Sequence, residues 1–130
     1  MFKIEKKTFG FLLVFGEFIL KAEMEQWLQE SKKALAGQKG SFGVFVDMRT
    51  LKPLPTDSQE VMVKGQQLYK QAGMTRSVVI LDNSITTMQF KRLAKESGIY
   101  DWERYIDAST VPNWEKAGVD WIVNGTDPDV

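Results

Sequence analysis

The chain has 130 residues, of which 43% are hydrophobic and 26% charged, and its 17 basic and 17 acidic residues cancel. It contains no cysteine and no histidine, which excludes disulfides and thiolate metal sites and removes the commonest general base and zinc ligand. The balanced charge gives no support for a nucleic-acid partner, because such proteins usually carry a net basic face. We therefore expect a globular protein without a cofactor, formed by a single domain over residues 1–130.

The apolar segments of the chain are short, which bears on its location. No apolar run approaches the roughly 20 residues that a membrane-spanning helix needs, and the longest is Phe11–Phe15. The amino terminus, Met1–Lys7, lacks the apolar region of a signal peptide. We expect a protein with no membrane span, located in the cytoplasm.

The first part of the chain predicts two strands followed by a helix. Residues 2–8 alternate weakly between apolar and polar, as in an edge strand, and the apolar run 11–15 after Gly10 is typical of a buried strand. The short turn between them predicts an antiparallel hairpin. From about residue 20 to 36 a helical stripe predicts a helix whose apolar positions are Leu20, Met24, Trp27, Leu28 and Leu35.

The segment Gly43–Arg49 organises the rest of the prediction. Its apolar run, entered through Gly43, predicts a central strand buried on both faces and leading into Asp47. Pro53 and Pro55 follow, and their fixed φ angles stiffen a loop. In open α/β sheets the binding crevice lies at the carboxyl ends of the strands. We therefore expect the functional surface on this loop.

Helices alternate with two further strands in the second half. Thr56 and Gln59 have the spacing of a capping box and predict a helix that ends at Gly73, with Gly65 inside it compatible with a close approach to the sheet. The remaining predicted elements are a strand over 77–82, a helix from Asn83 or Ser84 to about Ser97, a strand over 103–107, a helix with Pro112 in its first turn, and a frayed tail over 124–130.

The resulting order, β-β-α-β-α-β-α-β-α, predicts an α/β fold with a mixed, mostly parallel sheet of about five strands. This order, with an aspartate before the loop, resembles the STAS domain of bacterial anti-sigma-factor antagonists of the SpoIIAA type. It is most similar to a SpoIIAA-like group of uncharacterised bacterial proteins. The similarity spans nearly the whole chain and is carried by Asp47-Met48-Arg49 with Lys52-Pro53-Leu54-Pro55, by Gly73–Ser77 and by Trp102–Ile106.

The chain departs from these relatives at the position of their regulatory residue. Anti-sigma-factor antagonists carry Asp-Ser-Ser-Gly or a similar sequence on this loop, and a kinase phosphorylates the second hydroxyl residue. Here Asp47-Met48-Arg49-Thr50 occupies these positions, so arginine stands in the phosphoacceptor place. The resemblance implies a STAS-like fold and a non-enzymatic regulatory module that binds a protein partner, without the usual phosphoacceptor serine.

The loop supplies the candidate partner-binding residues, and several roles are open for them. Met48, Leu51 and Leu54 are either partner anchors or packing beneath the loop. Arg49 and Lys52 either bind an anion, with Thr50 as a modifiable neighbour, or Arg49 pairs with Asp47. The full candidate set is Asp47, Met48, Arg49, Thr50, Leu51, Lys52 and Leu54.

Other functions compete with this one. The acids at strand ends, Glu17, Asp47, Asp82 and Asp107, either form a carboxylate cluster that holds Mg²⁺ or cap the following helices. The content of Met and Phe is compatible with a small-molecule or lipid carrier, and Tyr100 and Trp102 belong either to an interface or to the core. A homodimer is a further alternative, since C2 dimers are the commonest assembly and the first strand offers an edge.

Overall fold

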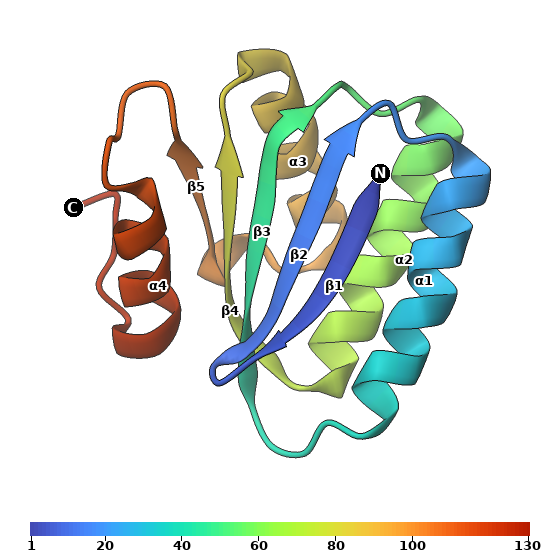
Figure 1. Ribbon diagram of the computed structural model, residues 1–130, viewed down its shortest axis with the longest axis horizontal. Coiled ribbons are helices and arrows are strands. Elements are labelled where there is room, and N and C mark those ends of the chain that lie inside the picture. The colour runs from blue at the N-terminus through green and yellow to red at the C-terminus, as the bar shows by residue number, and fades with distance from the viewer.

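The structure is a computed structural model that describes residues 1–130, and its five strands form one sheet in sequential order (Figure 1). The first two strands are antiparallel, and all other neighbours are parallel. The α/β class and the predicted order of elements are therefore confirmed. The strands are β1 (Phe2–Lys7), β2 (Gly10–Glu17), β3 (Phe42–Leu51), β4 (Met74–Leu81) and β5 (Glu103–Asp107); the helices are α1 (Lys21–Ala36), α2 (Thr56–Ala72), α3 (Ser84–Ser97) and α4 (Trp114–Asn124), with a short 3₁₀ turn η1 (Tyr100–Trp102).

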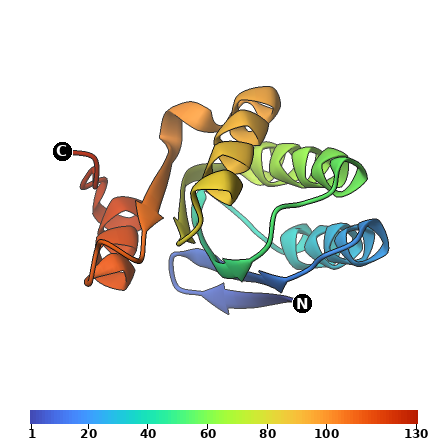
Figure 2. The same cartoon turned by 90° about the horizontal axis from the view of Figure 1, so that it is seen from above.

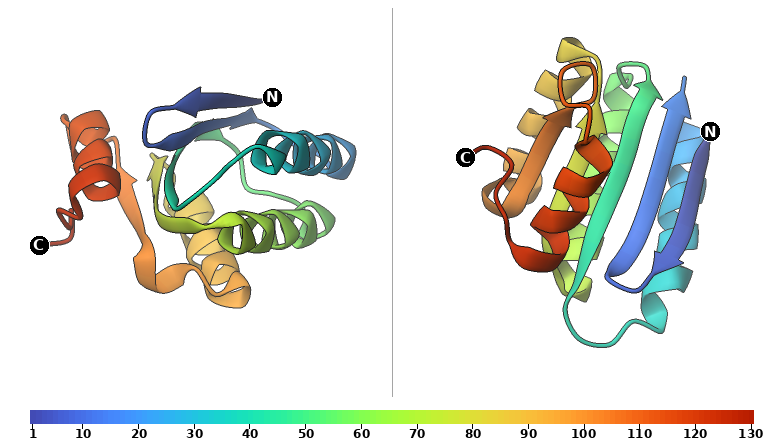
Figure 3. Two further views of the ribbon diagram at one scale, coloured as in Figure 1. Left: turned by 90° about the horizontal axis from the view of Figure 1, so that it is seen from below. Right: turned by 60° about the vertical axis from the view of Figure 1, so that its left-hand side comes forward.

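The helices are distributed unequally over the two faces of the sheet. Helices α1, α2 and α3 lie on one face, whereas α4 lies alone on the other (Figure 2). Each of the first three links a strand to its parallel neighbour, and right-handed crossovers that advance in one direction place all of them on the same side. Helix α4 packs against β3, β4 and β5, so that the outer face of β1 and β2 has no helix over it (Figure 3). No helix combines the length and the apolar character needed to cross a bilayer.

Strand β3 lies in the middle of the sheet and is buried on both faces, as its apolar run predicts. Val44 and Val46 belong to the large core beneath the three helices. Phe45 points the other way, into a smaller core under α4 that also contains Val78 and Trp121. The alternation of these side chains between two cores explains why the strand reads as continuously apolar.

A bulge near the end of β3 changes which side chains point into the core. Val14 of β2 pairs with Asp47, but Gly16 pairs with Thr50, so β3 holds one more residue than β2 across this interval. An extra residue reverses the two-residue alternation of a strand. Pairing with β2 resumes beyond the bulge, so β3 extends to Leu51. Residues 47–51 of the candidate set are therefore strand and not loop.

Two of the predicted helix starts are wrong. Helix α2 begins at Thr56 itself, the preceding Pro55 provides no side-chain cap, and Gln59 donates its amide to the carbonyl of Leu54 at 2.8 Å instead of closing a capping box. Helix α4 begins at Trp114, so Pro112 lies outside its first turn. The cap of α3 is confirmed, since Asn83 Oδ1 accepts the backbone N–H groups of Ile85 and Thr86.

The carboxyl-terminal tail is tied to the sheet, contrary to the prediction that it frays. Gly125 closes α4 in the left-handed conformation, at φ 70°. Beyond it, Asp127 accepts two hydrogen bonds from the guanidinium of Arg104 on β5, at 3.0 and 3.1 Å. A bidentate pair of this kind fixes orientation as well as charge.

Gly65 marks the closest contact between α1 and α2. A Cβ atom at this position would overlap the six-membered ring of Trp27, which is buried against Phe15 and stacked on Tyr69. The close approach that Gly65 suggests is therefore real, but its partner is an indole from the neighbouring helix. The sheet lies beyond that indole.

Gly65→Ala should destabilise the protein although alanine is the better helix former. Overpacking a core costs about 1–3 kcal/mol, which outweighs the gain of up to about 1 kcal/mol in helix propensity. Urea denaturation measures the net change. The matched control is Gly37→Ala, at a site with open space around the missing Cβ and φ −94°, where stability should stay level or rise. A gain in stability for Gly65→Ala would contradict the packing described.

Candidate functional site

The predicted site residues lie where the parallel strands end, at the edge from which the chain enters α1, α2 and α3 (Figure 1). We call this edge the carboxyl pole and define it by residues 17–20, 49–55 and 82–88. It is built from the ends of β2, β3 and β4, which are neighbours in the sheet. The segments therefore meet although they are far apart in sequence, as expected for the crevice of an open α/β sheet.

Arg49 is held in place on two sides. Its guanidinium donates two hydrogen bonds to the carboxylate of Asp47, at 3.0 and 2.9 Å, and its backbone N–H donates a third at 3.1 Å. The guanidinium carbon also lies 4.2 Å from the ring centroid of Trp114, at the start of α4. The hydrogen bonds to Asp47 raise the pKa of Arg49 above its ordinary value. Of the two predicted roles, pairing with Asp47 is confirmed, and the guanidinium has little freedom to rearrange around a ligand.

Three of the predicted partner anchors belong to the core. Met48, Leu51 and Leu54 are each only 3% exposed and pack in the large core beneath the three helices. Met48 points inward in phase with Val44 and Val46, and the bulge turns Leu51 to the same side, with Arg49 and Thr50 exposed between them. In this structure no partner can reach these three apolar side chains, and packing beneath the pole is their role.

The connection between β3 and α2 is fixed to its surroundings. The backbone N–H of Leu54 donates to Gln89 Oε1 on α3 at 2.9 Å. The carbonyl of Leu54 accepts the side-chain amides of Gln59, at 2.8 Å, and of Gln89, at 3.2 Å. With both backbone groups paired and proline on either side, this segment is a rigid part of the pole.

Exposed apolar side chains stand on two sides of the pole. Phe18 and Leu20, which follow β2, are 74% and 65% exposed, while Ile19 between them is buried and anchors the segment. Ile85 and Met88, one turn apart at the start of α3, are 61% and 72% exposed. The sequence analysis missed all four, and it placed Leu20 on the buried stripe of α1. Only the apolar run 18–20 beside a polar Glu17 could have drawn attention to them.

A polar hollow of about 310 Å³ lies at the pole, and residues that adjoin both apolar pairs in sequence line it. Glu17, which lies in the left-handed region at φ 60°, forms one wall next to Phe18. Asp82 and Asn83 form the opposite wall next to Ile85. The predicted residues Arg49, Thr50 and Lys52 line the hollow with them.

Arg49 also borders a second hollow, of about 290 Å³, on the face of the sheet that carries α4. Its walls are apolar, from Phe9, Leu12, Phe45 and Val119, and its rim is charged, with Lys7 and Glu115. Arg49 lines both hollows, and Trp114, which it contacts, lines the second. Arg49 therefore links the pole to Trp114, the first residue of α4.

The carboxylate cluster predicted at the strand ends does not form. No group of three or more acidic side chains is placed to hold a metal ion. Asp47 is occupied by Arg49, and Asp107 accepts hydrogen bonds from the backbone N–H and hydroxyl of Ser109, which lower its pKa. Asp82 faces the polar hollow and leaves the capping of α3 to Asn83.

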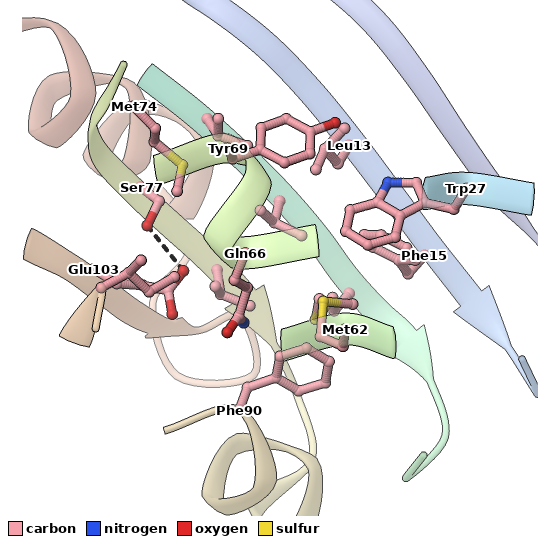
Figure 4. Close-up of a pocket in the computed structure, with 15 residues that line it drawn as sticks. Leu13, Phe15, Trp27, Met62, Gln66, Tyr69, Met74, Ser77, Phe90 and Glu103 are labelled. Carbon is pink, nitrogen blue, oxygen red and sulfur yellow. Dashed lines mark hydrogen bonds between the residues drawn. The ribbon is translucent and has the colours of Figure 1, made fainter. Parts of the chain in front are cut away.

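The interior between the sheet and the helices contains a small cavity (Figure 4). Its volume is about 30 Å³, and 12 of its 15 lining residues are hydrophobic. This volume accommodates about one water molecule, whereas pockets for drug-sized molecules hold about 300–1,000 Å³. The interior therefore offers no support for the lipid-carrier alternative.

Tyr100 stays partly exposed beside Tyr105, and Trp102 packs against both cores.

Comparison of the chain with protein-family models, with curated proteins and with solved structures gave no significant match.

Leu51→Ala should lower the free energy of unfolding by about 2–5 kcal/mol, as expected for truncation of a fully buried leucine. Lys52→Ala, one residue further and exposed, should change it by no more than about 0.5 kcal/mol. Urea denaturation of both variants separates the two positions. If Leu51→Ala were as harmless as Lys52→Ala, Leu51 would face solvent as the sequence alone allowed.

Proposed function

We propose that this chain is a non-enzymatic regulatory module of STAS-like type that binds a protein partner in the cytoplasm through the carboxyl pole. The observation that carries the proposal is the exposure of two apolar pairs at the pole. Phe18 and Leu20 follow Glu17, Ile85 and Met88 follow Asn83, and both Glu17 and Asn83 line the polar hollow. Single exposed apolar residues are normal, but a group at one place is typical of an interaction surface. Aromatic residues and methionine are also enriched in interfaces.

The rigidity of the pole supports the same function. Its central segment is paired through Leu54 to α2 and α3, and Arg49 is fixed by Asp47 and Trp114. A preorganised surface loses little conformational entropy when it binds. The apolar side chains would supply most of the affinity, and Thr50 and Lys52 would supply polar contacts at the centre.

The proposed module differs from phosphorylation-controlled relatives in one respect. Arg49 stands where the resemblance places a phosphoacceptor, and it is committed to Asp47. We propose that partner binding is governed by the apolar contacts and not by modification at position 49.

The proposal is tested by a photo-cross-linking amino acid, p-benzoylphenylalanine, placed in the full chain in its native cells. At position 18 or 88 it should form an adduct of one discrete size with another protein, because both side chains are exposed on the pole. The matched control positions are Lys33 and Ser41, which are exposed at the opposite end of the sheet and should give no such adduct.

A second substitution checks that the adduct reports the apolar surface. Ile85→Asp in the chain labelled at position 88 should abolish the adduct while leaving the melting temperature within a few degrees, since Ile85 is exposed. Adducts of equal strength at both ends of the sheet, or adducts only with a second copy of the chain, would contradict binding of a different protein at the pole.

A further inference from the structure

Glu103, the first residue of β5, carries a carboxyl group inside the protein. The residue is 4% exposed, and its side chain borders the interior cavity (Figure 4). Ser77 on β4 donates its hydroxyl to one carboxyl oxygen at 2.8 Å. The other carboxyl oxygen lies 2.6 Å from the hydroxyl of Tyr105. Both partners are neutral, and Glu103 forms no ion pair.

Several charged groups lie around this carboxyl, and none of them forms an ion pair with it. On α3, Lys91 places its ammonium 5.5 Å from the ring centroid of Tyr105. On β5 itself, Arg104 is paired with Asp127 in the tail. Asp101 of η1 and Asp129 of the tail add negative charge to an outer pocket that Lys91, Tyr105 and Glu103 itself also line. On the cavity side helix α2 contributes two polar side chains. The side-chain carbonyl of Gln66 accepts the hydroxyl of Ser97, and the hydroxyl of Tyr69 is hydrogen-bonded to that of Ser31.

The hydrogen-bond geometry is compatible with a protonated Glu103. Tyr105 Oη lies 3.4 Å from the backbone carbonyl of Phe90, so it can donate a hydrogen bond there while it accepts one from protonated Glu103. Burial disfavours the charged carboxylate more than the donors Tyr105 and Ser77 favour it, and the pKa of Glu103 is raised to about 7. Burial and the neighbouring carboxyl also raise the pKa of Tyr105, which therefore stays protonated.

The protonation state of Glu103 bears most directly on strand β5, which begins at this residue. It has five residues and pairs only with β4, at the edge of the sheet. The Ser77–Glu103–Tyr105 cluster joins its first residue to β4 on the cavity side. When the carboxyl ionises, an uncompensated charge is left in an apolar interior, and a small cavity lies beside it with room for about one water molecule.

We infer that Ser77, Glu103 and Tyr105 form a proton-dependent lock between β5 and β4, closed while Glu103 is protonated and loosened when it ionises. The direction in which stability changes with pH follows from the linkage between folding and proton binding. The folded protein holds the proton more tightly than the unfolded chain, so the stabilisation is complete below pH 4.5, the ordinary value for a glutamate. It is lost as the pH rises through about 7 and changes little above that.

The test is urea denaturation of the full chain at intervals between pH 5 and 8.5. At each pH the unfolding constant of the wild type is divided by that of Glu103→Gln, which has no proton to lose at this site. This ratio should rise by up to about tenfold per pH unit until about pH 7 and then level off. Glu96→Gln, at an exposed residue paired with Arg92, is the matched control and should keep the wild-type slope. The same pH dependence in wild type and Glu103→Gln would overturn the inference.

Two further measurements keep the test decisive. Amide hydrogen exchange, corrected for the intrinsic pH effect, should show Arg104–Ile106 opening more at pH 8.5 than at pH 6 in wild type. A loss of protection spread evenly over the sheet would overturn the local lock. If Glu103→Gln does not fold, Tyr105→Phe replaces it. This change removes the hydrogen bond that Tyr105 donates to the ionised carboxylate, so the pKa of Glu103 should rise and the pH dependence should move to higher pH. An unchanged profile would count against the lock.

Discussion

The packing of β3 between two cores is the constraint on which the rest of this structure depends. On one side Val44 and Val46 lie beneath the three helices, and on the other Phe45 lies under α4. Two glycines allow α4 to approach: a Cβ at Gly118 would come within 2.6 Å of the Phe45 ring, and one at Gly43 would overlap Ile122. Because this contact permits no larger side chain, it fixes both the strand and the single helix on the open face.

The position of β3 determines what the carboxyl pole presents to solvent. Met48 follows the strand alternation inward, and the bulge turns Leu51 inward as well, so the strand end is anchored while Arg49 and Thr50 remain accessible. The neighbouring strand β2 and helix α3 then contribute the exposed apolar pairs. The proposed interaction surface is thus a consequence of strand order and one extra residue, with no flexible loop at its centre.

The sequence predicted the order of elements well because each rests on a local signal. The strands are short apolar runs between turn residues, and the last helix carries a stripe that includes Gly118 and Trp121. Gly65 suggested a close approach to the sheet, but the group that it contacts is Trp27 on α1, 38 residues away in the chain, and no local pattern could name it. Long-range contacts of this kind are set by the packing of elements against one another.

The sequence placed the candidate residues at one edge of the sheet but did not predict which side chains are exposed there. The rule that crevices lie at strand carboxyl ends located the pole, and the Asp47–Arg49 pair was one of the predicted alternatives. A bulge breaks the two-residue periodicity, so a regular alternation could not predict the inward turn of Leu51. Exposure of Phe18 and Met88 depends on where α1 and α3 leave the sheet, which is a property of the assembled fold.

The most direct test of this account is native-state hydrogen exchange at pH 6 across all five strands. If β3 is the rigid centre that holds the pole, the amides of Val44, Phe45 and Val46 should exchange only through global unfolding, more slowly than those of the edge strands β1 and β5. Exchange of the β3 amides at the rate of β1 would contradict the account, because the pole would then have no fixed support.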